Sequence, residues 1–312
     1  MTSSYIIFVW AKGVSVCEIT MTSVHTKTNL SCKCLAFERV IAGAAAHFDL
    51  APSDLVVVDL CSSHAKDLYN LETLGIQSCH YFGFDNDVDS PGLAQKHHRS
   101  SLNLVTRMDL VHASDASIHE GIRAAMTHPC RVEASLKAHI VIINFAIHLF
   151  AHDLEKVFRL ASTGAWAHSG CFLQCSYISL EGMKSVVEAP HAFGLGVAFN
   201  AETRTLFLEG MATYAFDEGL RHMVPTILRE DSAHSFANNG VAEHIVSDEA
   251  IVVAAKRHSL DCVCAPDELS HAKLYHDCIR MHVAVAIPER TRTCLEAFMT
   301  LHKTLIVKHN DA

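Results

Sequence analysis

The sequence predicts an α/β fold built on a doubly wound, mostly parallel sheet. Short apolar runs rich in β-branched residues alternate with segments of helical periodicity, which is the pattern of βαβ units. Three of these runs end in an aspartate, and a fourth, IVII, is followed directly by Asn144. Right-handed crossovers bring the carboxyl ends of parallel strands to one edge, where ligands bind. The same pattern therefore also predicts where the site lies.

The expected elements begin with an Ala-rich helix over Leu35–Phe48, which has apolar residues at helical spacing. Parallel strands are expected at Leu55–Asp59, Cys79–Asp85, Leu104–Asp109, Ile140–Ile143 and Cys171–Tyr177. Helices are expected between them: one capped by Ser62 or Ser63 and stopped by Gly75, one ending near Arg99, one over Ile118–Met126 and one over Leu154–Ala161.

The pattern changes after the fifth strand. A hairpin is expected over Val197–Gly210 with its turn at Asn200–Thr203, and shorter helical and strand-like pieces follow. The residues after Pro288 predict an appended helix. We therefore expect an N-terminal arm over residues 1–34, a main domain over residues 35–287 and a C-terminal extension over residues 288–312.

The composition describes a globular protein with a net negative charge. Of the 312 residues, 50% are hydrophobic and 19% are charged, the formal net charge is −9, and the pI is near 6.2. This charge argues against a protein that neutralises many phosphates along a nucleic acid, but it is compatible with an enzyme that engages only a chain end. The apolar run Tyr5–Ala11 is too short for a signal peptide or a membrane span, so neither secretion nor a membrane partner is expected.

The 12 cysteines lack the spacing of a disulfide framework, so we expect reduced thiols inside the cell. The pairs Cys32/Cys34 and Cys262/Cys264 have no neighbouring partners that would complete a zinc site. We therefore expect no metal.

Asp59, Asp85 and Asp109 close three successive strands. An acid after the second strand is the position that accepts the hydroxyls of a ribose in nucleotide-binding sheets, and an acid after the third can accept from an adenine amine. The loop after the first strand, residues 61–66, contains no glycine, so it suits S-adenosylmethionine better than a dinucleotide pyrophosphate. In the alternative interpretation, each acid only caps the helix that follows it.

The fourth strand delivers an amide, a phenyl ring and an imidazole to the same edge: Asn144, Phe145 and His148. Together these groups can form a pocket for a flat polar ring. In the alternative interpretation, Phe145 and Ile147 belong to the core and His148 is an ordinary surface histidine.

The segments DLCSSHAKDL, GFDNDVDS, MD, NFAIHLF and HAKLY, in this order, resemble the mRNA cap guanine-N7 methyltransferases. The resemblance covers roughly residues 35–283, and NFAIH with its preceding strand is the most specific part. It implies a seven-stranded Rossmann-like methyltransferase sheet with inserted and C-terminal elements around a cap pocket. It also implies S-adenosylmethionine as cofactor, the capped RNA 5′ end (GpppN) as substrate, a capping-enzyme or activating partner, and a nuclear location, or a cytoplasmic one for a viral protein.

The resemblance also implies roles for particular residues. Asp85 would hold the cofactor ribose and Asp109 its adenine. The cofactor-binding set is Asp59, Cys61, Asp85, Asp109 and Asn144, and the cap-binding set is His64, Asn70, Arg99, Phe145, His148 and Tyr275. No catalytic residue is implied, because guanine N7 is unprotonated at neutral pH and the reaction needs orientation alone.

The sequence departs from the family pattern at several positions. The loop glycines are replaced by Cys61, Ser63, Ala65 and Lys66. Thr226 stands where the family has a guanine-binding glutamate, and the lysine of the first helix has no match, Arg39 being the nearest basic residue.

Three functions follow from these observations. The first is an active cap guanine-N7 methyltransferase. The second is a methyltransferase-fold subunit or cap-binding module without catalysis, which the missing glycines and glutamate favour. The third is a methyltransferase that acts on another nucleobase or on a small molecule, which would keep the cofactor acids but not the cap pocket.

Overall fold

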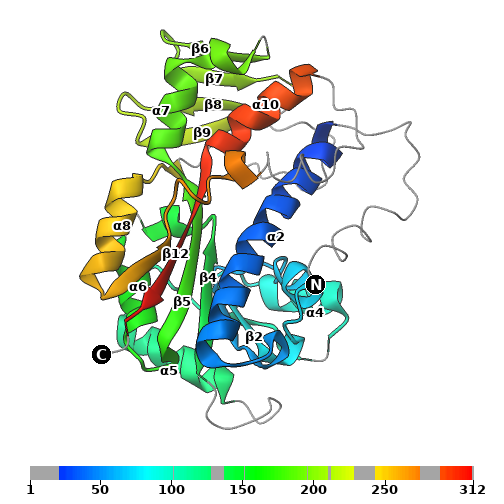
Figure 1. Cartoon of the computed structure of the whole chain (residues 1–312), viewed down its shortest axis with the longest axis vertical. Coiled ribbons are helices and arrows are strands. Elements are labelled where there is room, and N and C mark those ends of the chain that lie inside the picture. Colours follow the sequence, from blue (N-terminus) through cyan, green and yellow to red (C-terminus); the bar gives the residue numbers. More distant parts are fainter. Residues whose placement is uncertain are drawn as a thin grey trace.

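The computed structural model shows a large sheet flanked by helices, with a smaller sheet placed across one end (Figure 1). It describes residues 21–100, 102–127, 137–150, 152–194, 196–209, 212–227, 243–274 and 289–310.

The main sheet has seven strands in the order β11-β12-β5-β4-β1-β2-β3. Their bounds are β1 Val57–Leu60, β2 Tyr81–Asp85, β3 Val105–Arg107, β4 Ala138–Asn144, β5 Ala167–Ile178, β11 Leu260–Cys264 and β12 His302–His309. Strands β1 to β5 are all parallel, and β12 is antiparallel to both of its neighbours. The predicted doubly wound, mainly parallel fold is confirmed, and the strand order reverses between β1 and β4, the point where such sheets bind ligands.

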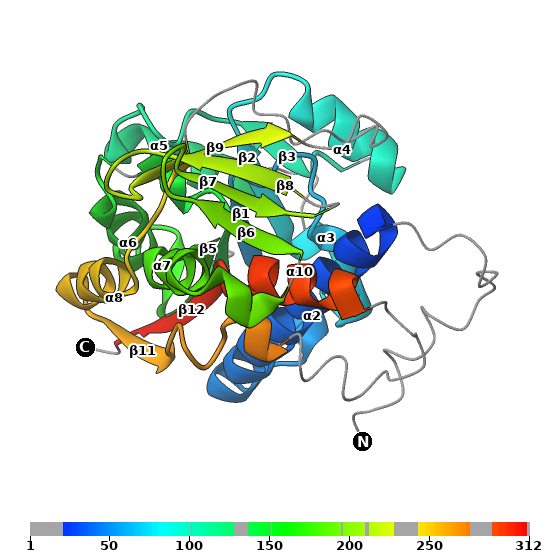
Figure 2. The ribbon, with the colours of Figure 1, turned by 90° about the horizontal axis from the view of Figure 1, so that it is seen from above.

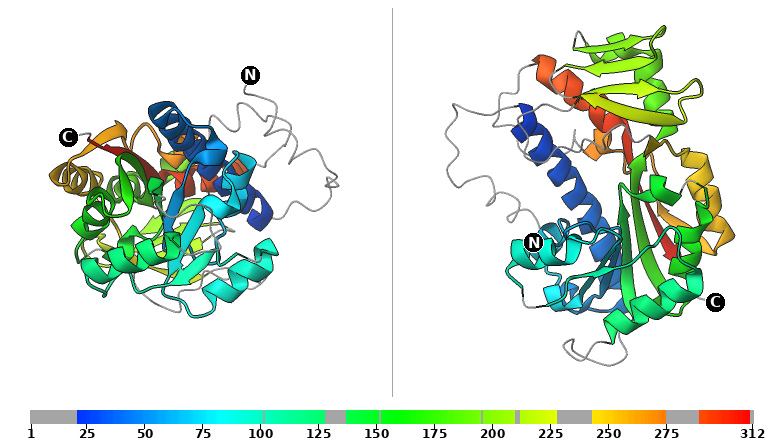
Figure 3. Two further views of the ribbon diagram at one scale, coloured as in Figure 1. Left: turned by 90° about the horizontal axis from the view of Figure 1, so that it is seen from below. Right: turned by 180° about the vertical axis from the view of Figure 1, so that it is seen from behind.

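Helices cover both faces of this sheet, as Figure 3 shows from behind. The helices are α2 Met21–Phe48, α3 Leu68–Thr73, α4 Ser90–His98, α5 Asp115–Met126, α6 Glu155–Ser162, α7 Leu180–Glu188, α8 Asp248–Arg257 and α10 Glu289–Thr300. One core places Val58 and Val141 against α5, α6 and α8, and the other places Val57 and Ile140 against α2, α3 and α4. Alternate residues of each strand thus face opposite cores, which explains why the runs are apolar throughout. Within the described residues, no helix has both the length and the hydropathy to cross a bilayer.

A second, antiparallel sheet lies over the carboxyl ends of the main strands (Figures 1 and 2). Its strands are β6 Val197–Asn200, β7 Thr205–Leu208, β8 Ala212–Phe216, β9 His222–Ile227 and β10 Glu243–His244. The predicted hairpin is confirmed: Asn200 Oδ1 accepts hydrogen bonds from the backbone N–H groups of Glu202 and Thr203. A third core joins this sheet to α7 and α10 through residues such as Leu206, Met183 and Ala297.

Two helix starts differ from the prediction. Helix α2 begins at Met21 rather than Leu35, so it crosses the boundary expected at residue 34. Helix α3 begins at Leu68 with Asp67 at the N-cap, and the serines expected to cap it lie in the preceding loop. Its stop is as predicted, because Gly75 takes a φ of 97° and the N–H of Ile76 bonds back to the carbonyl of Leu71.

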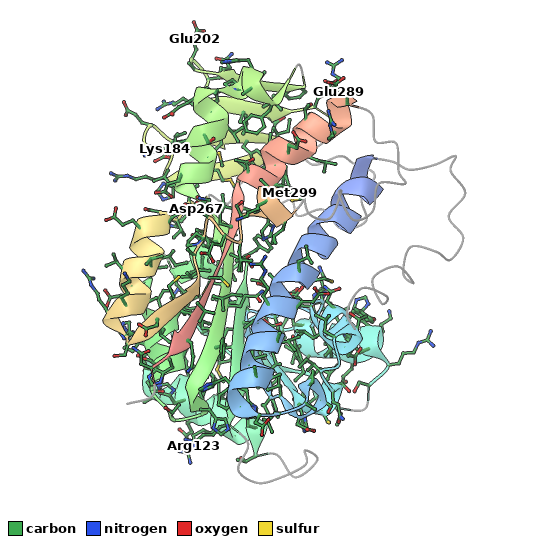
Figure 4. The ribbon with its side chains drawn as sticks, viewed as in Figure 1. Arg123, Lys184, Glu202, Asp267, Glu289 and Met299 are labelled. Atoms are coloured by element: carbon green, nitrogen blue, oxygen red, sulfur yellow. The ribbon has the colours of Figure 1, made fainter. Side chains whose placement is uncertain are left out.

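The C-terminal segment also differs from the expected appended helix. Helix α10 ends at Thr300, and the chain then forms β12, which pairs with β5 on one side and β11 on the other. This segment is therefore part of the main sheet. Lys303 on β12 is buried and forms ion pairs with Asp248 and Asp267, the latter labelled in Figure 4.

Candidate functional site

A cavity of about 470 Å³ lies between the carboxyl edge of the main sheet and the second sheet. The main-sheet wall includes Asp59, Asp85 and Asn144 from the ends of β1, β2 and β4. The opposite wall includes Tyr214 from β8 and His244 from β10. This volume is in the range that holds a nucleoside-sized ligand together with a second flat ring.

The loop after β1 has the backbone of a glycine loop without its glycines. Cys61, Ser63 and Ala65 have φ angles of 62°, 52° and 56°, in the left-handed region that favours glycine. These are three of the positions at which the family pattern has glycine. The backbone N–H of Ser62 donates to the carbonyl of Phe84 at 3.0 Å, which ties the loop to β2.

Asp85 fixes this loop from the end of the neighbouring strand. Its Oδ2 accepts a 2.8 Å hydrogen bond from the N–H of Ser63, and its Oδ1 accepts a 3.0 Å bond from the N–H of Asp87. The carboxylate is half-buried and lines the cavity, and each oxygen keeps a lone pair for another donor. Asp85 can therefore hold the loop and receive hydroxyl donors at the same time.

A buried polar network forms the floor of the cavity. Asp59 accepts a 2.6 Å hydrogen bond from the hydroxyl of Tyr81. Asp67 accepts from Lys33 Nζ at 3.0 Å and from Asn144 Nδ2 at 2.8 Å. Burial raises the pKa of the Asp59 carboxyl well above its usual range, and the negative charge of Asp67 raises it further. The geometry thus favours a neutral Asp59 beside the Lys33–Asp67 ion pair.

Phe145 stands directly after β4 in a strained conformation. Its φ is 53°, an outlier for a bulky side chain, and its N–H donates to the carbonyl of Ser176 at 2.7 Å. The rings of His271 and His302 meet its ring edge-on, with centroids 5.7 Å and 5.3 Å away. Lys33 Nζ lies 5.2 Å from the ring centroid, within cation–π range.

Six of the predicted site residues share the cavity lining, namely Asp59, Cys61, Asp85, Asn144, Phe145 and His148. They come from three neighbouring strands, as the strand-end argument requires. Their binding roles stay predictions.

Asp109 is outside the cavity lining. Its Oδ1 accepts from the N–H groups of Val111 at 3.1 Å and His112 at 2.9 Å, and its side chain is 45% exposed. The backbone hydrogen bond from His112 lowers the pKa of Asp109. Met108 and Leu110, on either side of it, line the cavity instead. Asp109 thus holds the turn over residues 109–112, whereas Ser114 caps the following helix α5, so the cofactor role of Asp109 stays a prediction.

The other cap-binding candidates also lie off the lining. His64 Nε2 is 4.0 Å from Asp87 Oδ2, Asn70 is buried on α3, and Arg99 takes a left-handed φ of 48° after α4. Tyr275 lies outside the described residues.

The sequence did not single out Lys33 or any residue of the second-sheet wall. Lys33 precedes the expected helix start, whereas Arg39, the nearest basic residue in the expected helix, lies beside Cys264 and away from the cavity. A start of this helix at Met21 would have placed Lys33 within it. No local pattern marks Tyr214 or His244 as residues that reach the main-sheet edge.

No protein-family model matches the sequence, and no curated protein matches it. Among solved structures, the CcbJ methyltransferase from Streptomyces caelestis is similar at a TM-score of 0.48 and 9% identity, covering 99% of each chain. An S-adenosylmethionine-dependent methyltransferase from Clostridium acetobutylicum is similar at 0.45 and 12% identity, covering 88% of this chain and 91% of that one. The magnesium protoporphyrin IX methyltransferase of Synechocystis, with bound SAH, is similar at 0.45 and 12% identity, covering 98% and 95%. These similarities are too distant to support an argument about activity. The argument about activity therefore rests on the cavity.

Proposed function

We propose that the protein is an S-adenosylmethionine-dependent methyltransferase that methylates guanine N7 of the RNA 5′ cap. The observation that carries the proposal is a single cavity in which Asp85, at the end of β2, and Phe145 and His148, after β4, face the same space. The order of the motifs around these residues supports a cap substrate. A capping-enzyme or activating partner and a nuclear or viral cytoplasmic setting belong to the same proposal.

The residues of the main-sheet wall fit the proposed cofactor. Asp85 has free lone pairs for the two ribose hydroxyls, and Met108, Leu110 and Val111 offer apolar surface for an adenine ring. Lys33 carries a positive charge at the same wall for the carboxylate of the methionine part. The bound sulfonium would supply an already activated methyl group.

The chain's own contribution to catalysis would be orientation. Guanine N7 needs no general base, so Phe145 and His148 need only hold the ring in line with the methyl group. Such positioning can supply roughly 7–11 kcal/mol of the barrier. A neutral His148 can donate or accept one hydrogen bond at the guanine edge, while Phe145 packs on the ring.

The test measures methyl transfer from labelled S-adenosylmethionine to GpppN-capped RNA, alongside calorimetric titration of SAH. We expect SAH binding, methylated cap, and at least about 10²-fold slower transfer by His148→Ala, because the ring would lose its positioning contact. His191→Ala is the matched control, since His191 lies on the exposed turn Pro190–Phe193, outside the cavity lining. The proposed cap substrate is contradicted if folded protein binds SAH but methylates no capped RNA, with or without a capping partner. Nucleosides and small molecules are then assayed as substrates.

A second candidate, a cap-binding subunit without catalysis, is favoured by one observation. The side chains of Cys61 and Ser63, at two of the three left-handed positions of the loop after β1, line the cavity and occupy space that glycine would leave to the cofactor. Folded protein that binds cap analogue but neither S-adenosylmethionine nor SAH would select this candidate.

A further inference from the structure

Four imidazoles gather on the second-sheet side of the cavity, and we call His148, His152, His222 and His244 the histidine cluster. They come from three segments: the turn after β4, the start of β9, and β10. The ring centroid of His244 is 4.2 Å from that of His222 and 5.4 Å from that of His152. His148 and His244 line the cavity and His152 is exposed, so the cluster extends from the cavity wall to solvent.

The strand register fixes two of these rings side by side. His244 on β10 pairs directly with His222 on β9 in the antiparallel second sheet. Directly opposed residues of an antiparallel pair point to the same face, with Cβ atoms roughly 4.5–5.5 Å apart. The contact is therefore a property of the fold rather than of two mobile side chains.

The charge around the cluster is unbalanced. The groups that act on His244 are His222, His152, His148 and one carboxylate, Asp217. Asp217 Oδ2 lies 3.3 Å from Nδ1 of His222, and its Oδ1 accepts from the N–H groups of Arg221 and His222. Burial, and then the neighbouring imidazoles, lower the pKa of His244. Asp217 is the one carboxylate among the groups that act on His244, so protonation of more than one of these imidazoles leaves positive charge that an added anion balances.

We propose that three members of the histidine cluster, His152, His222 and His244, form a phosphate site that takes up protons as it binds the polyphosphate of the substrate, while His148, on the cavity side, contacts the guanine. This assignment rests on the proposed function, in which the guanine ring lies deeper, against Phe145. Among the described residues, no group of three or more His, Cys, Asp or Glu side chains has a metal-binding arrangement, so the imidazoles are assigned as hydrogen-bond donors. Lys33, a cation at the main-sheet wall, pairs with Asp67 and is assigned to the methionine carboxylate of the cofactor.

Proton uptake gives the site a pH dependence with a fixed sign. A bound phosphate favours the charged imidazole, so the complex holds more protons than the free protein. A terminal phosphate group itself takes up a proton near pH 6. Affinity for the fully ionised phosphate therefore increases as pH falls from 8 towards 6. The limit is about tenfold per pH unit for each proton taken up.

The test uses sodium tripolyphosphate, which contains neither guanine nor methyl donor. Its binding to the full chain is measured by calorimetry at pH 6, 7 and 8, in two buffers of different ionisation enthalpy that report the protons taken up. After subtraction of the titration of tripolyphosphate itself, we expect uptake of about one proton by the protein and at least about fivefold tighter binding of the fully ionised ligand at pH 6 than at pH 8. His152→Gln, at an exposed position, and His222→Gln should each weaken binding at pH 6 at least about fivefold and flatten the pH profile, whereas His191→Gln should change neither.

The outcomes separate this proposal from the proposed function. Tripolyphosphate binding that does not depend on pH, or that survives both cluster substitutions unchanged, overturns the phosphate site even if capped RNA is methylated. Proton-linked binding that requires the cluster supports the site, and absence of methyl transfer in the same preparation would then count against the methyltransferase alone. Far-UV circular dichroism of each variant verifies that it is folded. If His222→Gln does not fold, the result for His152→Gln alone decides whether the phosphate site exists.

Discussion

The two walls of the cavity are built in different ways. On the main-sheet wall, side chains hold backbone and one another through direct polar contacts, as Asp85 holds the N–H of Ser63 and Asp67 holds Lys33. On the second-sheet wall, Tyr214 and Met223 belong to a third core shared with α7 and α10, and His244 contributes an imidazole. The first wall is held by polar contacts between its own side chains and backbone, whereas the second is held mainly by apolar packing on α7 and α10.

This difference suggests a division of labour. A wall fixed by carboxylates and strained backbone suits a ligand that is the same in every reaction cycle, as a cofactor is. A wall on an added sheet suits the part of the site that selects the substrate. Each prediction below tests one contact on the fixed wall against a comparable group that lacks it.

The largest effect is expected from Asp85→Ala. The substitution removes a charged acceptor of two backbone N–H groups and the proposed acceptor of the ribose hydroxyls. We expect SAH to bind about 100-fold more weakly, which corresponds to about 2.7 kcal/mol. Asp109→Ala, at the next strand end but outside the cavity lining, should change the SAH affinity less than about threefold. Equal losses of SAH affinity in the two variants, measured by calorimetric titration, would contradict the distinction between Asp85 and Asp109 and support Asp109 as a cofactor ligand.

The second effect concerns Lys33 and the free energy of unfolding. Lys33→Met leaves Asp67 without its cation, close to the buried Asp59. Because the Lys33 side chain is 20% exposed, we expect a loss of about 2 kcal/mol in urea denaturation, below the range for fully buried pairs. Adding Asp67→Asn should restore more than half of it. Lys184→Met on the outer face of α7 is the control (Figure 4). A similar loss of unfolding free energy in this variant would show that the effect is not specific to Lys33.

The strand-end pattern predicted the fixed wall well. Each of β1, β2 and β4 is an apolar run that ends in a polar side chain, so the sequence alone places Asp59, Asp85 and Asn144 at one edge of the sheet. Strand β12 was missed because it begins with three buried polar residues, His302–Thr304, which hide its apolar half. Lys303 is stable there only because Asp248 and Asp267 pair with it, and those partners are distant in sequence.

The second wall could not be predicted for a related reason. Hairpin β6–β7 was recognised from its turn, but nothing local shows that β8 and β10 bring Tyr214 and His244 over the edge of another sheet. That placement is set by the third core, whose members lie on helices before and after the second sheet. Packing between segments far apart in the chain leaves no periodic signal.

The third prediction uses pH to compare two strand-end acids. Because the pKa of Asp59 is raised in the folded protein, the folded state holds its proton longer, and the stability of the protein falls as pH rises above the ordinary value of 3.8. Asp59→Asn keeps an acceptor for Tyr81 and should remove this part of the pH profile, at a cost of at most about 1 kcal/mol near pH 4. Asp109→Asn should change the profile in the opposite sense, since its lowered pKa contributes stability that is lost as pH falls. Urea denaturation of the three proteins measures both differences, the Asp59 part above pH 3.8 and the Asp109 part below it. Slopes of the same sign would contradict the assignment of Asp59 as the neutral acid.

The smallest effect on the free energy of unfolding is expected in the loop after β1. There, two adjacent serines, one with a left-handed φ and one without, separate the effect of backbone strain from the effect of the side chain. A left-handed φ costs a non-glycine residue about 1–2 kcal/mol, and a change to glycine removes this cost. The greater freedom of glycine in the unfolded chain offsets about 0.5–1 kcal/mol of that gain. Ser63→Gly, at a φ of 52°, should therefore stabilise the protein by about 0.5–1 kcal/mol, because the N–H that donates to Asp85 is retained. Ser62→Gly, one residue earlier and outside the left-handed region, should be neutral or destabilising. If both substitutions shift the denaturation midpoint in the same direction, the strain does not lie in the backbone, and the loop conformation must instead be what these side chains themselves prefer.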